Sequence, residues 1–506
     1  MKDASRRTRG YHPEDRAVSP LPSVLFAASE CAPFAKSGGL GDVVGALPIA
    51  LRERGHDVRV VLPRYGFIDT RGMRRHEAPL GVPLGASEAW CAVYETTLPG
   101  SDVPLYLIEH DALFARPYLY DPVGGWSHDN FARFTCLSRA SLQLCKYLGF
   151  IPDVVHVHDW PTALVPVLLN TVEASGPLAA TATVLTVHNL AYQPHFAAAE
   201  LDLAGVGWGV FQEQGLADQG AINPLKGGLW HATMLTTVSP RYADEVRTPA
   251  MGAGLDHVLR YRGADLVGIL NGIDERVWDP RADPHLPAPF DAADLSGKTV
   301  CKRALQDDLG LAPEPLTPIV GIIARLAEQK GIDLVLACLD RLLALDLQLA
   351  VLGAGDPALE RELLAAAATY PGRVGVRIGF DERVAHRIEA GADMFLMPSR
   401  FEPCGLNQMY SQRYGTLPIV HAVGGLDDTV EDFDPARGTG TGFKFHPATA
   451  DTVLAAVDRA CEVWSERPLV WRAMQRRAMT TPFGWDRAAE RYDEVYRWAL
   501  ERRRWW

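Results

Sequence analysis

Short runs of apolar, largely β-branched residues alternate with longer amphipathic stretches along most of this chain. Most of the runs are too apolar to alternate with polar residues, as is usual for strands of a parallel sheet covered by helices on both faces. In the first half, seven runs predict such strands: VLFAAS from Val24, DVRVVLP from Asp57, PLYLIEH from Pro104, DVVHVHD from Asp153, ATVLTVHN from Ala182, MLTTVS from Met234 and DLVGILNG from Asp265.

The alternation stops at Asp274 and resumes at Pro318. Between them lies a proline-rich segment with one short helical stretch, which is typical of an interdomain connection. The second series predicts strands from Pro318, Leu347, Arg373, Ala392 and Thr416, with helices over 332–345, 357–370, 381–391 and 401–415 and further helices from Thr449.

We therefore expect an α/β protein with two doubly wound, Rossmann-like domains and a ligand cleft where the carboxyl ends of their strands face each other. At 506 residues the chain is long enough for two large domains. The expected division is a flexible tail at 1–20, a first domain at 21–275, a connection at 276–315, a second domain at 316–480 and a C-terminal helix at 481–506 that packs back on the first domain.

Charge and composition exclude several classes of function. The chain carries 50 basic and 62 acidic residues, a net charge of −12, whereas nucleic-acid binding needs a basic footprint. We expect no nucleic-acid partner and no membrane partner, because no apolar run approaches the roughly 18 residues that span a bilayer. The N-terminus lacks an apolar leader, and the eight cysteines include no C-x-x-C pair. These features predict a cytoplasmic protein with reduced thiols.

A glycine-rich turn with one lysine follows the first predicted strand. Gly38, Gly39 and Gly41 stand before a predicted helix, and Lys36 adds a positive charge. Bare amides at a helix N-terminus favour an anion such as a phosphate. The pattern is neither G-x-G-x-x-G, since Val44 stands where the last glycine belongs, nor a Walker loop. A tight strand-to-helix turn remains the alternative.

Polar residues follow two further strands of the first series: His156, His158, Asp159 and Trp160 after one, and His188 and Asn189 after the next. The H-x-H spacing can indicate zinc, but no further Cys or His pattern completes four ligands. Buried polar residues that end a strand are the plain alternative. A carbohydrate site is the better functional interpretation, because sugar hydroxyls need such hydrogen-bonding groups and an aromatic face.

The second series carries two cations and several glycine turns. Arg325 and Lys330 follow its first strand, where they could bracket a diphosphate and stabilise its departing charge; a solvated helix end is the alternative. Glu402 follows the strand MFLMPSR, near the expected N-cap of a helix that begins with Pro403. Further backbone turns that could contact a ligand are formed by Gly353, Cys404, Gly405, Leu406, Gly424 and Gly425. The pair Asp432 and Asp434 forms a D-x-D in a turn-rich loop, which we interpret as solvated and not as a metal site.

These motifs together resemble the bacterial glycogen synthases, also called starch synthases, of the ADP-glucose type. The resemblance runs from about residue 22 to 430 through KSGGLGDVVGALP, VVHVHDW, LTVHNLAYQ, GILNGIDERVWDP, DPHLPAPF, IIARLAEQKGIDL, LGAGDP, PSRFEPCGLNQMY and YGTLPIVHAVGGLDDTV. It implies the GT-B fold and retaining transfer of glucose from ADP-glucose to the non-reducing 4-hydroxyl of an α-1,4-glucan such as glycogen. It also implies that no metal and no other cofactor is needed.

The resemblance assigns roles to single residues. Lys36 and the glycines after it would contact the donor diphosphate, and Arg325 and Lys330 would stabilise the departing ADP. Glu402 would bind the glucosyl hydroxyls, while Asp159 and His188 would line the sugar side, with the His188 carbonyl facing the developing oxocarbenium ion.

The chain departs from the family pattern at Ser37 and Asn407, which replace threonines, in YQPHF at 192–196, and at His421-Ala422, which replace basic residues. A synthase using UDP-glucose, or another GT-B sugar enzyme such as a phosphorylase with pyridoxal phosphate, is the alternative. A catalytically silent glucan-binding module is a third reading, disfavoured by the retention of Lys36, Arg325, Lys330 and Glu402.

Overall fold

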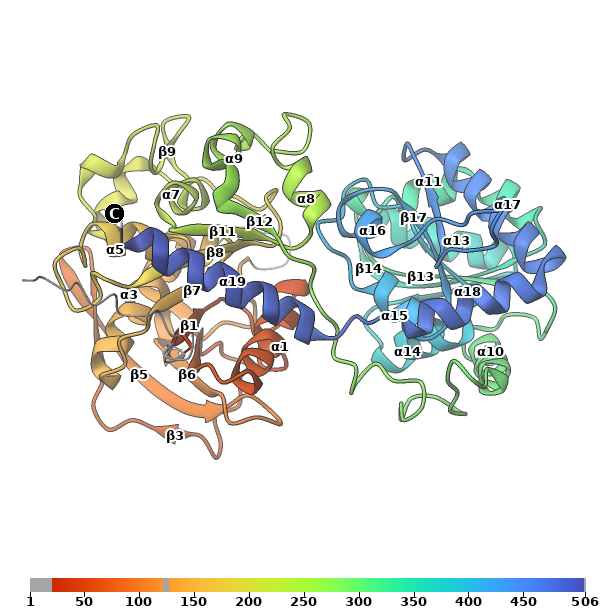
Figure 1. Cartoon of the computed structure of the whole chain (residues 1–506), viewed down its shortest axis with the longest axis horizontal. Helices are drawn as coiled ribbons and strands as arrows, with labels where there is room; N and C mark the ends of the chain where they lie inside the picture. The colour runs from red at the N-terminus through yellow and green to blue at the C-terminus, as the bar shows by residue number, and fades with distance from the viewer. Residues whose placement is uncertain (1–20, 122–126, 505–506) are drawn as a thin grey trace, which may run out of the picture.

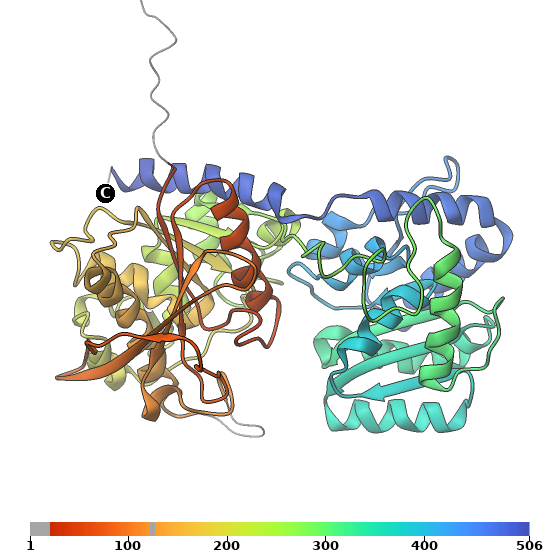
Figure 2. The ribbon, with the colours of Figure 1, turned by 90° about the horizontal axis from the view of Figure 1, so that it is seen from below.

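The computed structural model describes residues 21–121 and 127–504 and shows two α/β domains (Figures 1 and 2). The expected tail at 1–20 lies outside the described residues. Within the described residues, no helix combines the length and the apolar character needed to cross a bilayer.

The first domain is built on a ten-stranded sheet of order β12-β11-β8-β7-β1-β2-β6-β5-β3, with β4 paired to β5. The strands from β12 to β6 are parallel and are the seven that the sequence predicts: β1 Val24–Ala27, β2 Val58–Pro63, β6 Pro104–Glu109, β7 Val154–His158, β8 Ala182–Val187, β11 Met234–Thr237 and β12 Leu266–Gly268. The antiparallel strands that continue the sheet beyond β6 were not predicted: β3 Arg74–Arg75, β4 Leu80–Leu84 and β5 Ser87–Thr97.

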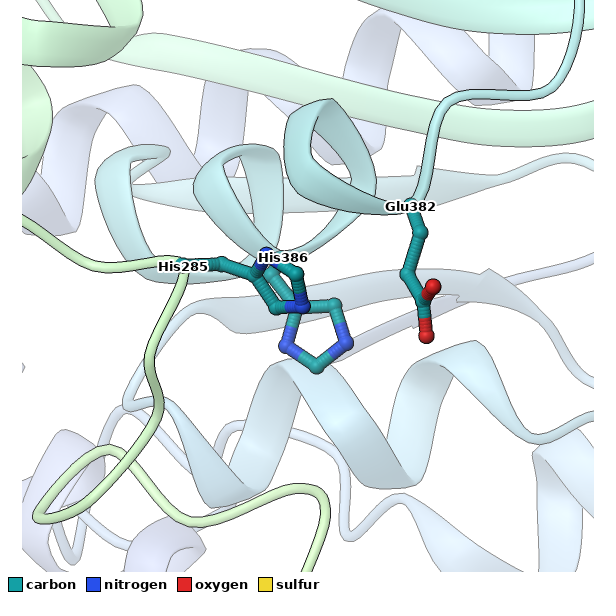
Figure 3. A group of neighbouring side chains, drawn as sticks. All are labelled: His285, Glu382 and His386. Atoms are coloured by element: carbon teal, nitrogen blue, oxygen red, sulfur yellow. The ribbon is translucent and has the colours of Figure 1, made fainter.

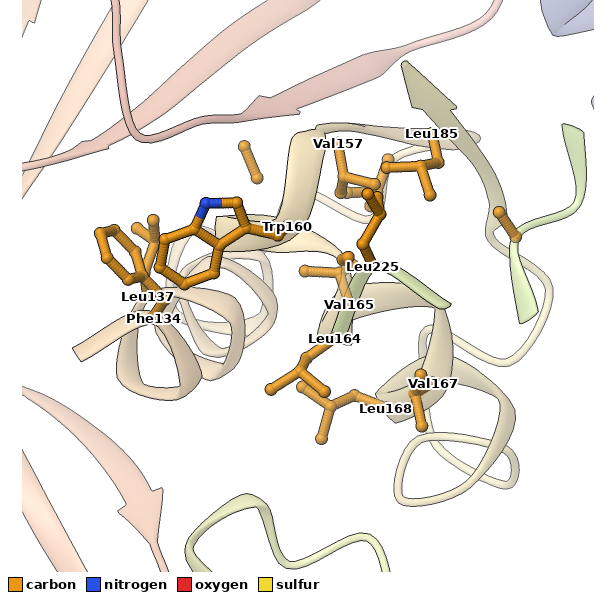
Figure 4. Close-up of a cluster of buried hydrophobic side chains, with 14 of the residues drawn as sticks. Phe134, Leu137, Val157, Trp160, Leu164, Val165, Val167, Leu168, Leu185 and Leu225 are labelled. Carbon is orange, nitrogen blue, oxygen red and sulfur yellow. The ribbon is translucent and has the colours of Figure 1, made fainter. Parts of the chain in front are cut away.

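Two apolar clusters flank this sheet. One joins the sheet to helices such as α3 and α5, and Figure 4 shows Trp160 packed against Phe134 and Leu137 of α3.

The helices of this domain are α1 Gly39–Glu53, α2 Asp111–Phe114, α3 Asn130–Leu148, α4 Asp159–Thr162, α5 Leu164–Asn170, α6 Leu201–Ala204, α7 Pro224–His231, α8 Pro240–Glu245 and α9 Asp256–Arg262. A small hairpin is formed by β9 Ala217–Asp218 and β10 Ala221–Ile222, and 3₁₀ turns lie at η1 Ala198–Glu200, η2 Trp208–Val210 and η3 Gly263–Asp265.

The second domain holds a parallel sheet of order β15-β14-β13-β16-β17-β18. Its strands are β13 Ile319–Leu326, β14 Gln348–Gly355, β15 Val374–Ile378, β16 Met394–Met397, β17 Leu417–His421 and β18 Phe443–Phe445. The expected helix over 332–345 is divided at Cys338, where the backbone leaves the helical region. The helices are α10 Ser296–Leu309, α11 Ile332–Ala337, α12 Leu339–Leu343, α13 Pro357–Thr369, α14 Glu382–Gly391, α15 Asn407–Arg413, α16 Gly424–Thr429, α17 Ala450–Glu466 and α18 Pro468–Thr480, with η4 at Glu328–Lys330.

The last helix, α19 (Trp485–Arg503), leaves the second domain and lies along the first (Figures 1 and 2). It packs with α1 over the second apolar cluster of the first sheet. Its Tyr496 hydroxyl lies 2.8 Å from Nδ1 of His156 in β7, and Asp493 lies 2.7 Å from Nε2 of His56. The chain therefore crosses between the domains twice.

In each sheet the strand order reverses at the first strand of the domain, so that later strands are added on both sides of it. β1 lies between β2 and β7, and β13 lies between β14 and β16. In doubly wound sheets the ligand crevice opens at this switch point, outside the carboxyl ends of the strands. The loops after β1, β7, β13 and β16 therefore border this crevice.

Candidate active site

A cleft of about 1860 Å³ lies between the domains. It exceeds the roughly 300–1000 Å³ of an ordinary small-molecule pocket, so it has room for two extended substrates. Its lining contains all but three of the site residues that the sequence suggests: Lys36, Gly38, Gly39, Asp159, His188, Asn189, Arg325, Lys330, Gly353, Glu402, Cys404, Gly405 and Leu406. Gly41, Gly424 and Gly425 are not part of that lining.

Glu30 organises the glycine loop after β1. Its buried carboxylate accepts hydrogen bonds from the amide of Ser37 at 2.6 Å, from the amide of Gly38 at 3.2 Å and from the Tyr120 hydroxyl at 2.6 Å. The Gly41 amide donates to the Gly38 carbonyl at 3.2 Å. The expectation that the amides of all three glycines are bare is thus wrong for Gly38 and Gly41, because the loop uses them to hold its own shape. Sequence reasoning missed Glu30 and Tyr120.

Open space remains beside Gly38 and Gly39, where an added Cβ would meet no atom within 4 Å. Gly41 differs, since its Cβ would lie 3.1 Å from the side chain of Lys36. Lys36 itself is half exposed and pairs with Asp42 at 2.6 Å. Phosphate oxygens could enter the open space beside this half-exposed cation.

Asp159 and His188 form a buried unit after β7 and β8. The Asp159 carboxylate accepts the His188 amide at 2.7 Å, and Asp159 itself adopts a left-handed backbone conformation with φ 52°. Burial raises the pKa of Asp159 to about 7, although the amides of His188 and Asn189 oppose the shift. Burial also lowers the pKa of His188 to about 3, so its imidazole is neutral at neutral pH.

His156 and His158, the two histidines of β7, pack beside this unit. His158 Nδ1 lies 3.0 Å from His188 Nε2, and the rings of His156 and His158 stack at 4.4 Å. His156 contacts Thr186 at 2.6 Å and Tyr496 at 2.8 Å. Both nitrogens of His156 are thus engaged within the core, which matches the plain interpretation of this histidine as a buried polar group.

Lys330 and Glu402 meet at the switch point of the second sheet. The Lys330 ammonium lies 2.5 Å from Oε2 of Glu402, which also accepts the Ser399 hydroxyl at 3.0 Å. Both side chains are largely buried, at 19% and 8% exposure. Arg325 lies on β13 and donates across the cleft to the hydroxyl of Tyr192 at 3.1 Å. The cations of the second domain therefore face the polar groups of the first.

The loop from Glu402 to Leu406 corrects the expected helix over 401–415. α15 begins only at Asn407, so Pro403 does not stand in its first turn and Glu402 is not its N-cap. Gly405 has φ 71°, which ends any helix that approaches it. Burial raises the pKa of the Cys404 thiol to about 12, so the thiol is inert at neutral pH.

Gly424 and Gly425 hold this loop in place from α16. The Gly425 amide donates to the carbonyls of Glu402 and Pro403, and the Gly424 amide donates to the carboxylate of Glu245 at 3.1 Å. Their amides are therefore not available to an anion, contrary to the expectation of a bare turn. The two glycines instead allow a close approach, since a Cβ on either would lie within 2.1 Å of a loop carbonyl oxygen.

Two further features of the second domain have structural roles. A Cβ on Gly353 would lie 2.2 Å from the Ala324 carbonyl oxygen, so this glycine lets β14 lie against β13 at the cleft wall. Asp432 pairs with Arg459 at 2.7 Å and accepts the Lys444 amide, while Asp434 accepts the Ala436 amide. Both aspartates of the D-x-D thus have partners within the second domain: Asp432 on β18 and α17, and Asp434 in its own loop.

Two doubly wound parallel sheets that face each other across such a cleft are the architecture of the GT-B glycosyltransferases. The chain is 52% identical to a glycogen synthase of Anaeromyxobacter sp. (strain Fw109-5) over 94% of its length and 98% of that protein. It is 48% identical to glycogen synthase 1 of Geobacter metallireducens over 95% of its length and 96% of that protein. The chain belongs to the glycogen synthase family, and it is a glycosyltransferase.

Models of known families and solved structures agree with this. Residues 23–261 match the starch synthase catalytic domain, and residues 311–473 match glycosyl transferases group 1. The structure is similar to the catalytic domain of starch synthase IV from Arabidopsis thaliana, bound to ADP and acarbose, with 35% identity and a TM-score of 0.88 over 96% of this chain and all of that one. Sucrose-phosphate synthase from Thermosynechococcus elongatus, at 19% identity and a TM-score of 0.57, shares the fold.

Proposed function

We propose that this glycogen synthase transfers glucose from ADP-glucose to the non-reducing 4-hydroxyl of an α-1,4-glucan, with retention of configuration. The names of the relatives support the glucan product, and the ADP bound to the Arabidopsis starch synthase supports the donor. The observation that carries the proposal is the Lys330–Glu402 pair, which faces the Asp159–His188 unit within one cleft.

The donor would bind mainly to the second domain. Its diphosphate would take the ammonium of Lys330 and the guanidinium of Arg325, whose charges stabilise ADP as it leaves. The Lys330 contact would then be shared between Glu402 and a phosphate oxygen, and the Glu402 carboxylate would accept glucosyl hydroxyls. Gly353 and the loop residues Cys404, Gly405 and Leu406 would form the wall against which the nucleotide sugar lies.

The sugar would be held against the first domain. Asp159 fixes the His188 peptide through its amide, and His158 fixes the His188 ring. The His188 carbonyl would thus meet the developing oxocarbenium ion without reorganisation, which is how fixed dipoles lower a barrier. Asn189 would contact hydroxyls beside it, and Lys36, Gly38 and Gly39 would close on the diphosphate from the opposite side. Gly41, Gly424 and Gly425 would act through the loops that they shape.

The same proposal has three corollaries. Arg325, Lys330 and Lys36 would supply the charge that a metal would otherwise provide, so transfer should proceed in EDTA. The eight free thiols suit a reducing compartment such as the cytoplasm. The functional division of the chain would follow the boundaries expected from the sequence, with 276–315 as the connection between the acceptor domain and the nucleotide-sugar domain.

The test is nucleotide release by the purified enzyme, measured with ADP-glucose and with UDP-glucose, each with and without glycogen. We expect release of ADP that depends on glycogen, and much slower release of UDP. Equal or better use of UDP-glucose would refute the donor assignment, and donor cleavage that is independent of glucan would refute the acceptor assignment.

A further inference from the structure

Two histidines and a glutamate meet on the second-domain side of the cleft, apart from the groups assigned above. His285 lies on the segment that connects the domains, Glu382 is the first residue of α14, and His386 follows one turn later (Figure 3). One ligand atom from each lies within 4.8 Å of the others, and this is the group of metal-ligand side chains that stands out in the described part of the chain. The i, i+4 spacing on α14 places Glu382 and His386 on one face of the helix.

The neighbours of His386 hold its ring in one orientation, as is usual for a metal-binding histidine. Its Nδ1 lies 2.7 Å from the carboxylate of Asp283, which also accepts the Tyr414 hydroxyl at 2.6 Å. The ring is fixed by Trp278, which stacks on it at 4.0 Å and 5°. A carboxylate on one imidazole nitrogen is the outer-shell partner that orients most metal-binding histidines and makes the other nitrogen the ligand.

That other nitrogen has no hydrogen-bond partner among the residues that the structure describes. His386 is 1% exposed, and its Nε2 is buried without a hydrogen bond. A buried polar atom left unsatisfied costs roughly 1–3 kcal/mol, and most such atoms in proteins have a partner. The orphaned nitrogen therefore points to a ligand that the polypeptide does not itself provide.

From these observations we propose that His285, Glu382 and His386 bind a divalent transition-metal ion of the Zn²⁺ type. Two imidazoles and one carboxylate are a donor set that Zn²⁺ accepts, with a fourth position left for water, whereas Ca²⁺ and Mg²⁺ prefer oxygen ligands. Bonds of about 2.0–2.2 Å require the ligand atoms to move closer than they lie here. Glu382 is exposed and His285 is half-buried, so both side chains have room to turn toward the fixed His386 ring.

The ion would connect the interdomain segment to α14 of the second domain. His285 belongs to the connecting segment, and the Arg387 guanidinium already donates to its carbonyl at 3.1 Å. Glu382 and His386 belong to α14, and both line the cleft together with the adjacent Phe380. Since a ligand that binds only the folded state stabilises it, Zn²⁺ should raise the unfolding temperature of the enzyme.

The test is calorimetric titration of the metal-free full-length enzyme with Zn²⁺, together with scanning calorimetry. The variants are Glu382→Gln and His285→Ala, which alter accessible side chains and leave the buried Asp283–His386–Tyr414 contacts in place. His257→Ala is the matched control, because His257 is an exposed histidine that lies 3.9 Å from a single glutamate, Glu213.

We expect the wild type and His257→Ala to bind one Zn²⁺ per chain at this site and to unfold at a higher temperature with Zn²⁺ than without it. Each ligand variant should bind at least about tenfold more weakly, because even the loss of an outer-shell partner costs 10–100-fold in affinity, and should lose the thermal shift. Unchanged binding in both variants, no saturable binding, or binding that disappears only when the thiols are alkylated would each overturn the proposal.

Discussion

Lys330 and Lys36 approach the same cleft from opposite domains, but their surroundings differ. Lys330 is mostly buried and contacts Glu402, whereas Lys36 is half exposed and contacts Asp42. A buried charge acts in a medium of low effective dielectric, so it interacts more strongly with charge that develops during the reaction. The two lysines should therefore contribute to different steps.

We predict that Lys330→Gln lowers kcat more than it raises the KM for the donor, because the lost interaction is stronger in the transition state than in the ground state. The expected loss is about 3 kcal/mol, or about a hundredfold in rate. Lys36→Gln, the matched control, should mainly raise the donor KM. Steady-state kinetics of both variants decide this, and a change in KM alone for Lys330→Gln would reject its role in stabilising the leaving group.

Asp159 should make stability depend on pH in a particular window. An unfolded aspartate releases its proton near 3.8, whereas the folded group keeps it until about 7. The folded state therefore binds more protons between these values, so this group's contribution to stability is lost as the pH rises from 3.8 through about 7. The size is a few kcal/mol at most, at about 1.36 kcal/mol per pKa unit.

The measurement is the urea midpoint of the wild type and of Asp159→Asn across that window. The urea midpoint of Asp159→Asn should rise relative to that of the wild type as the pH rises. Taking the difference removes the opposite contribution of His188, whose lowered pKa costs stability as the pH falls below 6.5. A difference that stays constant with pH would show that Asp159 is already ionised throughout.

For single residues, the sequence predicted which side chains lie at the cleft better than it predicted which contacts they make. Asp159, His188 and Lys330 could be chosen because polar residues in the segments after parallel strands meet at the switch point. Arg325 was expected after the first strand of its series but lies within β13, near its carboxyl end. Glu30 also follows a parallel strand, but nothing local shows that its carboxylate will hold the amides of Ser37 and Gly38. The roles of Gly424 and Gly425 depend on a loop about twenty residues away, and local spacing carries no such information.

Gly38 and Gly425 have different surroundings, so an alanine substitution at each should affect a different property of the enzyme. A Cβ on Gly425 would lie 2.1 Å from the Cys404 carbonyl oxygen, whereas a Cβ on Gly38 would meet nothing within 4 Å. Gly38 also has an extended backbone, with φ −163°, which any residue adopts.

We predict that Gly425→Ala destabilises the enzyme by about 1–3 kcal/mol, as overpacking usually does, and lowers kcat by moving the Glu402 loop. Gly38→Ala should change stability by less than about 0.5 kcal/mol and raise the donor KM, because the methyl group occupies space meant for phosphate. Thermal unfolding and donor kinetics provide the readouts. A Gly38→Ala variant with an unchanged KM would show that the donor does not reach this loop.

Helices and strands with a clear apolar sequence pattern were predictable. Those whose position depends on tertiary contacts were not. The continuous apolar runs gave the parallel strands of both sheets. β5 was missed because it is an antiparallel strand whose exposed and buried residues alternate and whose pattern differs from the fully apolar runs. The start of α15 was misplaced because Gly405 and the packing of 402–405 against α16 override a proline that suits a first helical turn.

α8 of the first domain contacts the second domain beside the cleft. The Ser239 hydroxyl donates to the Pro403 carbonyl at 2.7 Å, and the Arg241 amide donates to Asp428 at 2.8 Å, so α8 and the loops around α16 already touch. The glycine loop belongs to the first domain, whereas Arg325 of β13 and Lys330 of η4 belong to the second. A donor held by both groups, as proposed above, would contact both domains. This arrangement favours closure by rotation about the existing contact.

We predict that ADP and a maltooligosaccharide together reduce the radius of gyration in small-angle scattering. ADP with the Lys330→Gln variant should produce a smaller change, since one of the contacts that draws the domains together is missing. Identical scattering curves with and without both ligands would show that the cleft needs no closure.

The position of α19 affects how the enzyme can be made. The first sheet is complete at Gly268, yet one of its apolar faces is covered by residues 485–503. At roughly 5–20 residues per second, a ribosome needs about 10 to 40 s to reach that helix. During this interval the part of the sheet that α19 later contacts, on β7, β8 and β11, stays uncovered. Chains cut short by even a late stop codon would keep that face exposed permanently, so we expect truncations, more than point substitutions, to aggregate and to depend on chaperones.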